Sequence, residues 1–220
     1  MSVRGSFDER ISEIRTEIIR MGNLSSEMID LAVQAATTGN EDHAREVIVR
    51  DDLVDSLEEE VIRATVMLVM REAPVAGDLR TLTSTLGVIG EFEKVADDAV
   101  KLARRARKVR GFFPGELKSS LVEMAGQSRK LLASCVRLYT HYDAALASEI
   151  VDADDVVDKQ YSIACQRIIE LIRENPVHAE KYVATMEIFH ALEHIADRCV
   201  SVAKRLRVHY ESPMTGSRLG

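Results

Sequence analysis

The sequence predicts an all-α protein made of two tandem antiparallel three-helix bundles that are related by internal duplication. Three observations support this fold class. The composition suits amphipathic helices, with 46% hydrophobic and 30% charged residues but only 4 prolines and 11 glycines. Apolar residues follow the helical spacing along nearly the whole chain, and short motifs of the first half recur in the second.

Breaks in this spacing divide the chain into six expected helices. The breaks are Gly39-Asn40, Pro74, the turn at 111–115, a weaker break at 141–144, and Asn175-Pro176. We therefore expect helices at residues 6–37, 41–71, 76–109, 116–141, 145–174 and 178–209. Because the connections are short, consecutive helices should run antiparallel. The polar tail at 211–220 is expected to be disordered.

The internal duplication is visible in four motifs that recur in the same order at offsets of 100 to 103 residues. The matching segments are 51–55 with 154–158, 71–75 with 173–177, 93–97 with 193–197, and 104–107 with 204–207. Agreement of this kind indicates duplication rather than coincidence. We expect a first repeat over residues 1–112 and a second over 113–210.

Charge and cysteine content exclude several classes of protein. A net charge of -7 argues against general nucleic-acid binding, which relies on excess Lys and Arg. The charged N-terminal segment does not resemble a signal peptide, and no apolar run of about 18 residues is present to span a bilayer. Cys135, Cys165 and Cys199 are widely separated and are expected to be reduced core residues. These features predict a cytoplasmic protein without membrane insertion.

Each expected bundle carries two pairs of acidic residues spaced by four positions, which places both carboxylates of a pair on one helix face. About six such pairs are expected by chance among the 36 acidic residues, so a single pair means little. These pairs, however, occupy equivalent places in both repeats and interrupt apolar stripes. The pairs are Asp51 with Asp55, Glu93 with Asp97, Asp154 with Asp158, and Glu193 with Asp197.

Carboxylates at the edge of a helix–helix seam repel one another and lose hydration, so a cation has to compensate them. Arg or Lys side chains are one alternative. Metal ions are the other, and packing the second helix of each bundle against the third would bring four carboxylates together. An all-oxygen ligand set favours iron, manganese or magnesium over zinc or copper. The predicted metal ligands are Asp51, Asp55, Glu93, Asp97, Asp154, Asp158, Glu193 and Asp197.

Two segments resemble the signatures of a known family. Residues 74–80, followed by 91–97, resemble the first-repeat signature of the PhoU family, and residues 192–199 resemble its second. The resemblance extends from Phe7 to about Tyr210. It implies a cytosolic protein, often dimeric, that represses the phosphate-starvation response by coupling a phosphate-specific ABC transporter to a sensor histidine kinase. It also implies iron or other divalent metals on the eight acidic residues named above.

The chain departs from the family pattern at several positions. Ala96 and Ala196 stand where the family usually has Gly, and His194 stands where it often has Arg. The second repeat lacks the Asp-Leu-Arg element of residues 78–80 and has Glu-Lys-Tyr at 180–182. We therefore expect the two halves to differ in metal affinity or in partner contacts.

Other interpretations remain open at this stage. An accessory protein of a low-affinity phosphate permease would share the helical design. Glu187 and His190 match the Glu-x-x-His element of ferritin-like di-iron bundles, but this element occurs only once. Basic residues at 101–110 and 204–207 either complement helix dipoles or form a docking surface. Because no phosphate-binding loop or catalytic motif is present, we predict that the protein is not an enzyme.

Overall fold

The structure, a computed structural model, describes residues 3–72 and 74–211. It confirms the all-α fold class, since these residues form helices and connecting turns without a strand. Two short 3-10 helices accompany the long helices. The elements are α1 (Val3–Thr38), α2 (Glu41–Glu72), α3 (Ala76–Lys108), η1 (Gly115–Leu117), α4 (Lys118–Thr140), α5 (Ala144–Glu174), η2 (Pro176–His178) and α6 (Ala179–Glu211).

The helix ends differ from the expected ones by at most three residues. α4 and α6 begin later than expected because the 3-10 helices η1 and η2 precede them. Glu211, the first residue of the predicted tail, is instead the last residue of α6, and its Oε1 accepts a hydrogen bond from Tyr142 Oη at 2.5 Å. The remainder of that tail, residues 212–220, lies outside the described residues.

Local sequence explains where the helices stop and start. Gly39 follows α1 with a φ of 74°, a left-handed conformation that other residues adopt only with strain. Asn40 then caps α2, because its Oδ1 accepts a hydrogen bond from the backbone N of Asp42 at 3.0 Å. Asp143 caps α5 in the same way, accepting from the backbone N atoms of Ala145 and Leu146. The predicted breaks at these two places are therefore confirmed.

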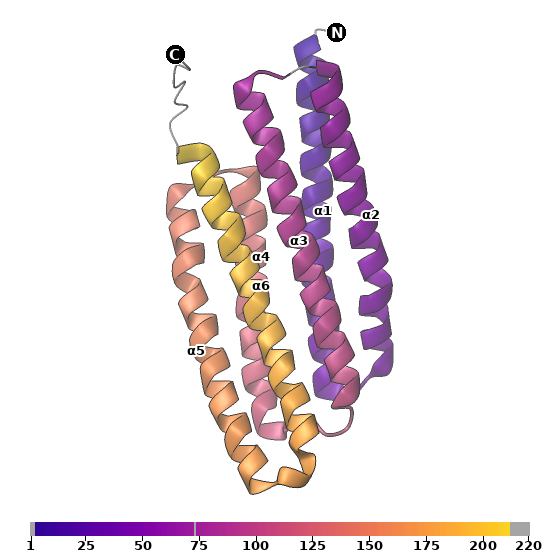
Figure 1. Cartoon of the computed structure of the whole chain (residues 1–220), viewed down its shortest axis with the longest axis vertical. Helices are drawn as coiled ribbons and strands as arrows, with labels where there is room; N and C mark the ends of the chain where they lie inside the picture. Colours follow the sequence, from indigo (N-terminus) through magenta and orange to yellow (C-terminus); the bar gives the residue numbers. More distant parts are fainter. Residues whose placement is uncertain (1–2, 73, 212–220) are drawn as a thin grey trace, which may run out of the picture.

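Two three-helix bundles lie side by side, α1–α3 in one and α4–α6 in the other (Figure 1). Inside each bundle the consecutive helices are antiparallel neighbours, as expected from the short connections. α3 and α6 occupy the middle and pack against each other more extensively than any other helix pair, while α1 also packs against α4. Buried apolar residues of both halves therefore form one continuous core.

The contact between the halves contains buried charge. Asp98 of α3 is fully buried, and Glu91 on the same helix is also buried. Lys101 Nζ donates to Asp98 Oδ1 at 2.7 Å, and Lys94 Nζ lies 3.3 Å from Glu91 Oε1. Arg198 of α6 lies between the two carboxylates, at 3.9 Å from Glu91 and 3.8 Å from Asp98. The two bundles are thus joined by charged groups as well as by apolar packing.

The cysteines follow the core prediction only in part. Cys135 and Cys199 are buried, and the thiol of Cys135 donates to the backbone carbonyl of Cys199 at 3.3 Å. Cys165 is only partly buried, so its assignment to the core was wrong. None of the three forms a disulfide. Among the described residues, no helix combines the length and the apolar character that crossing a membrane requires.

Candidate metal centres

The first pair of predicted motifs converges where α2 packs against α3. Asp51 and Asp55 of α2 lie close enough to Asp97 of α3 for its charge to act on both carboxyl groups. Glu93 interacts in turn with Asp97 and with Asp55 across the same seam. The four carboxylates therefore gather in one cluster, which we call the first acidic cluster.

The second half repeats this arrangement between α5 and α6. Asp154 interacts electrostatically with Asp158 on its own helix and with Asp197 of α6. Glu193 is affected by the charges of Asp197, Asp158 and Asp154. These four carboxylates form the second acidic cluster. In both halves the predicted residues therefore lie near enough for their charges to act on one another.

Burial and mutual repulsion disfavour the charged forms of five of these carboxyl groups. Desolvation, followed by the charges of neighbouring carboxylates, raises the pKa of Asp51 to about 6 and that of Glu93 to about 7. The same causes raise the pKa of Asp154 to about 6. The pKa values of Asp55 and Glu193 are also raised, again mainly by burial. Near neutral pH both clusters therefore carry negative charge at an energetic cost.

Nearby basic side chains do not remove this cost. Arg104, Lys204 and Lys94 lower the pKa values of Asp51, Asp154 and Glu93 respectively, but burial and repulsion outweigh them. Among the described residues, no Lys or Arg forms an ion pair within 4.0 Å with any of the eight carboxylates. The alternative in which Arg or Lys alone compensates the clusters is therefore the weaker one.

The second acidic cluster also contains acceptor atoms without a hydrogen-bond partner among the described residues. Asp154 Oδ1 and Glu193 Oε2 are buried and accept no hydrogen bond from any described residue. Such oxygens are costly unless a cation or a donor approaches them. The carboxylate oxygens present thus fit the ligand preference of hard metal ions.

Several neighbours of the clusters were missed by the sequence analysis. Glu58 of α2 adds a further carboxylate beside Glu93, one helical turn beyond Asp55. In the second half, Tyr161 and Cys165 of α5 lie close enough to Glu193 for its charge to contribute to raising their pKa values. Glu58 follows Asp55 at a helical spacing of three, a signal that the search for spacings of four passed over.

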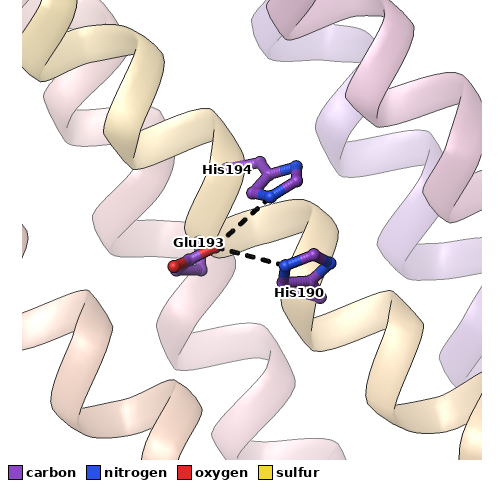
Figure 2. A group of neighbouring side chains, drawn as sticks. All are labelled: His190, Glu193 and His194. Carbon is purple, nitrogen blue, oxygen red and sulfur yellow. Dashed lines mark ion pairs between the residues drawn. The ribbon is translucent and has the colours of Figure 1, made fainter.

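Two imidazoles border the second acidic cluster. Figure 2 shows His190, Glu193 and His194 on neighbouring turns of α6, with each ring facing the carboxylate. The Nε2 atoms of His190 and His194 both lie 3.9 Å from Glu193 Oε2, and the ring centroids are 4.0 Å apart. The first acidic cluster has no histidine at the equivalent positions, which are Gly90 and Lys94.

The ferritin-like alternative finds no support in the arrangement of Glu187. Its Oε1 lies 3.0 Å from Arg105 Nη2 of α3, so the carboxylate is held by a cation of the other half. His190, the second member of that element, lies beside Glu193 instead. A di-iron bundle requires both residues to bind the same metal pair, and this geometry does not provide it.

The basic helix ends are partly engaged in ion pairs inside the molecule. Arg107, in the last turn of α3, and Arg110, in the turn that follows it, both pair with Glu41 at the start of α2, at 3.5 and 2.9 Å. Arg80, from the segment that resembles the first-repeat signature, donates to the carbonyl of Val208 in α6. The contacts of Glu41 join two helix ends within the first bundle. The contact of Arg80 joins the start of α3 to the end of α6, and so connects the two bundles.

Comparison with known proteins agrees with the duplicated fold. The PhoU domain model matches residues 18–106 and again 121–206. A relative from Clostridium acetobutylicum, named phosphate-specific transport system accessory protein PhoU homolog, is 23% identical over 91% of this chain and 92% of its own length. A relative of the same name from Pseudomonas aeruginosa is 25% identical over 90% of this chain and 82% of its own.

Solved structures share the fold. The crystal structure of PhoU from Pseudomonas aeruginosa superposes with a TM-score of 0.87 at 24% identity, covering 92% of this chain and 98% of that one. The phosphate transport system regulatory protein PhoU from Streptococcus pneumoniae gives a TM-score of 0.85 at 20% identity, covering 94% and 98%. With two copies of the domain spanning most of its length, the chain belongs to the PhoU family.

Proposed function

We propose that the chain is an accessory protein of a phosphate transport system and acts by regulation rather than catalysis. Two relatives over most of its length carry the name of such an accessory protein. In this proposal the protein represses the phosphate-starvation response by linking a phosphate-specific ABC transporter, through its ATPase subunit, to a sensor histidine kinase. It works in the cytoplasm, as a homodimer, without binding nucleic acid or inserting into the membrane.

We further propose that both acidic clusters bind metal ions, with iron, manganese or magnesium as the candidates. One observation carries this proposal. Eight carboxylates from four helices gather in two repeat-related clusters, and the basic side chains nearby do not offset their repulsion. Bound cations would remove that repulsion and tie α2 to α3 and α5 to α6. The residues that would hold them are Asp51, Asp55, Glu93, Asp97, Asp154, Asp158, Glu193 and Asp197.

Substituting one ligand in each cluster tests the metal proposal. We expect the double variant Asp97→Ala/Asp197→Ala to bind Mn²⁺ and Fe³⁺ at least about tenfold more weakly than the wild type, because each cluster loses a ligand. Equilibrium dialysis followed by metal analysis measures this. The matched control is Asp52→Ala/Asp155→Ala, which removes two exposed acids at equivalent places. Equal, weak binding by wild type and test variant would remove the assignment and leave the fold intact.

Deleting the gene tests the regulatory proposal. We expect expression of phosphate-scavenging genes to rise several-fold in phosphate-replete cells, because the kinase would no longer receive the repressing signal. Reporter expression with and without the restored wild-type gene measures the effect. Unchanged expression would contradict the regulatory role. Reduced uptake through a low-affinity permease, with unchanged expression, would favour the alternative accessory function.

A further inference from the structure

We propose that His190, Glu193 and His194 form a mixed nitrogen–oxygen site that makes the second half bind Zn²⁺, whereas the first half keeps an all-oxygen site. This inference rests on the proposed metal binding at the acidic clusters and adds a difference in selectivity between them. It also differs from the expectation for carboxylates alone, which disfavours zinc.

The geometry of α6 brings the three side chains together. Spacings of three and four residues place His190, Glu193 and His194 on one helix face, and histidines four residues apart are used by helical zinc sites. One ligand atom from each residue lies within 4.8 Å of the other two (Figure 2). Zn²⁺ binds nitrogen and carboxylate oxygen at about 2.0 to 2.2 Å, so ligands about 3 to 4 Å apart surround it. Small side-chain adjustments therefore suffice for an ion to enter.

A second carboxylate lies near one of the rings, on the side away from Glu193. His194 Nδ1 lies 3.9 Å from Oδ1 of Asp98, the fully buried residue of α3, while its Nε2 faces Glu193. Metal-bound histidines usually direct their other ring nitrogen toward a carboxylate or carbonyl, which fixes the tautomer that can bind the metal. Glu193 Oε2 is buried and accepts no hydrogen bond from the described residues, which leaves it available as a ligand.

The first half lacks this arrangement at the equivalent positions. Gly90 replaces the first histidine, and Lys94 replaces the second with a positive charge beside Glu93. The space next to Gly90 faces Glu58, whose Oε1 lies 3.9 Å from the position a Cβ would take. In the second half, Tyr161 lies near His190 instead, with ring centroids 5.6 Å apart. Imidazole favours zinc, whereas carboxylate oxygen favours magnesium and manganese, so the halves should select different ions.

Metal binding by the full chain tests this selectivity. We expect His190→Ala/His194→Ala to weaken Zn²⁺ binding by about 100-fold, because two ligands are lost, and to change Mn²⁺ affinity by less than about threefold. Competition with a chromogenic chelator measures Zn²⁺, and calorimetry measures Mn²⁺. His43→Ala/His141→Ala is the matched control, since both residues lie outside the acidic clusters. A test variant with the Zn²⁺ affinity of the wild type would overturn the inference.

Nuclear magnetic resonance adds a direct readout. In ¹⁵N-labelled wild type, one equivalent of Zn²⁺ should shift the Nε2 signals of His190 and His194 and leave the other four of the 6 histidines in place. Shifts confined to other histidines would contradict the site. A variant with only the first cluster disabled, Glu93→Gln/Asp97→Asn, should retain Zn²⁺ binding. If the wild type bound Mn²⁺ but not Zn²⁺, this inference would be wrong and the proposed function would stand. If it bound Zn²⁺ but none of Mn²⁺, Fe³⁺ and Mg²⁺, only the hard-metal part of the proposed function would be wrong.

Discussion

The substitution Arg198→Met is expected to lower the melting temperature of the protein by about 10 °C. Arg198 of α6 is the residue of the second half that approaches both buried carboxylates of α3, Glu91 and Asp98. Without it, Lys94 and Lys101 would remain as their basic partners. Removing a cationic partner from a buried carboxylate costs about 3 kcal/mol, and here two buried carboxylates lose the partially exposed Arg198 together. In a protein of this size each kcal/mol corresponds to roughly 2 to 4 °C.

A surface ion pair between the same two halves is the control. Arg129 of α4 pairs with Asp30 of α1, and the two side chains are 41% and 39% exposed. Arg129→Met should lower the melting temperature by no more than about 3 °C, because solvent screens such pairs. Circular dichroism melts of both variants at one pH measure the difference. Similar small losses in both would mean that the buried charges between α3 and α6 contribute little to stability.

The second large effect concerns pH and metal together. We expect the metal-free protein to melt at a higher temperature at pH 5.5 than at pH 7.5. Folding raises the pKa of Asp51 and Asp154 to about 6 and that of Glu93 to about 7, so the folded state holds protons more tightly than the unfolded chain. The stability that these three carboxyl groups contribute when protonated is fully present below about pH 4 and is lost as the pH rises to about 7. His209, whose pKa is lowered, acts in the opposite direction but is a single group.

The expected size of this effect is about 2 kcal/mol, or roughly 6 °C. One unit of pKa shift corresponds to about 1.4 kcal/mol, and partial exposure of these groups reduces the sum considerably. Saturating Mn²⁺ at pH 7.5 should restore the loss, since a ligand at 100 times its Kd adds about 2.7 kcal/mol. Scanning calorimetry with and without metal measures both changes.

Neutralising one carboxyl group provides the control for the pH effect. Glu93→Gln should reduce the difference between pH 5.5 and pH 7.5, because it removes the titrating group whose pKa is raised to about 7. The metal-free variant should therefore be more stable than metal-free wild type at pH 7.5. If metal-free wild type were instead equally stable at both pH values, the repulsion within the acidic clusters would be too weak to require a cation.

Much of the fold could be read from local sequence. Helical spacing, the left-handed glycine at Gly39 and the caps at Asn40 and Asp143 act over a few residues, so the elements and their ends were predicted to within three residues. Duplication made the candidate site predictable as well. Two acids four positions apart must share a helix face, and their recurrence in the second half separated Glu93 and Asp97 from chance pairs.

Only the tertiary structure decided which helices face each other across the two halves. The pattern of an amphipathic helix assigns a charged residue to solvent, so nothing local indicated that Asp98 would be fully buried or that Arg198 would reach it from α6. The same packing turned Glu187 toward Arg105 and placed His194 between Glu193 and Asp98. The sequence by itself determined the helices and their acidic faces, because those depend on neighbours within a few turns. The surroundings of each charge depend on residues about a hundred positions away, and packing between helices sets them.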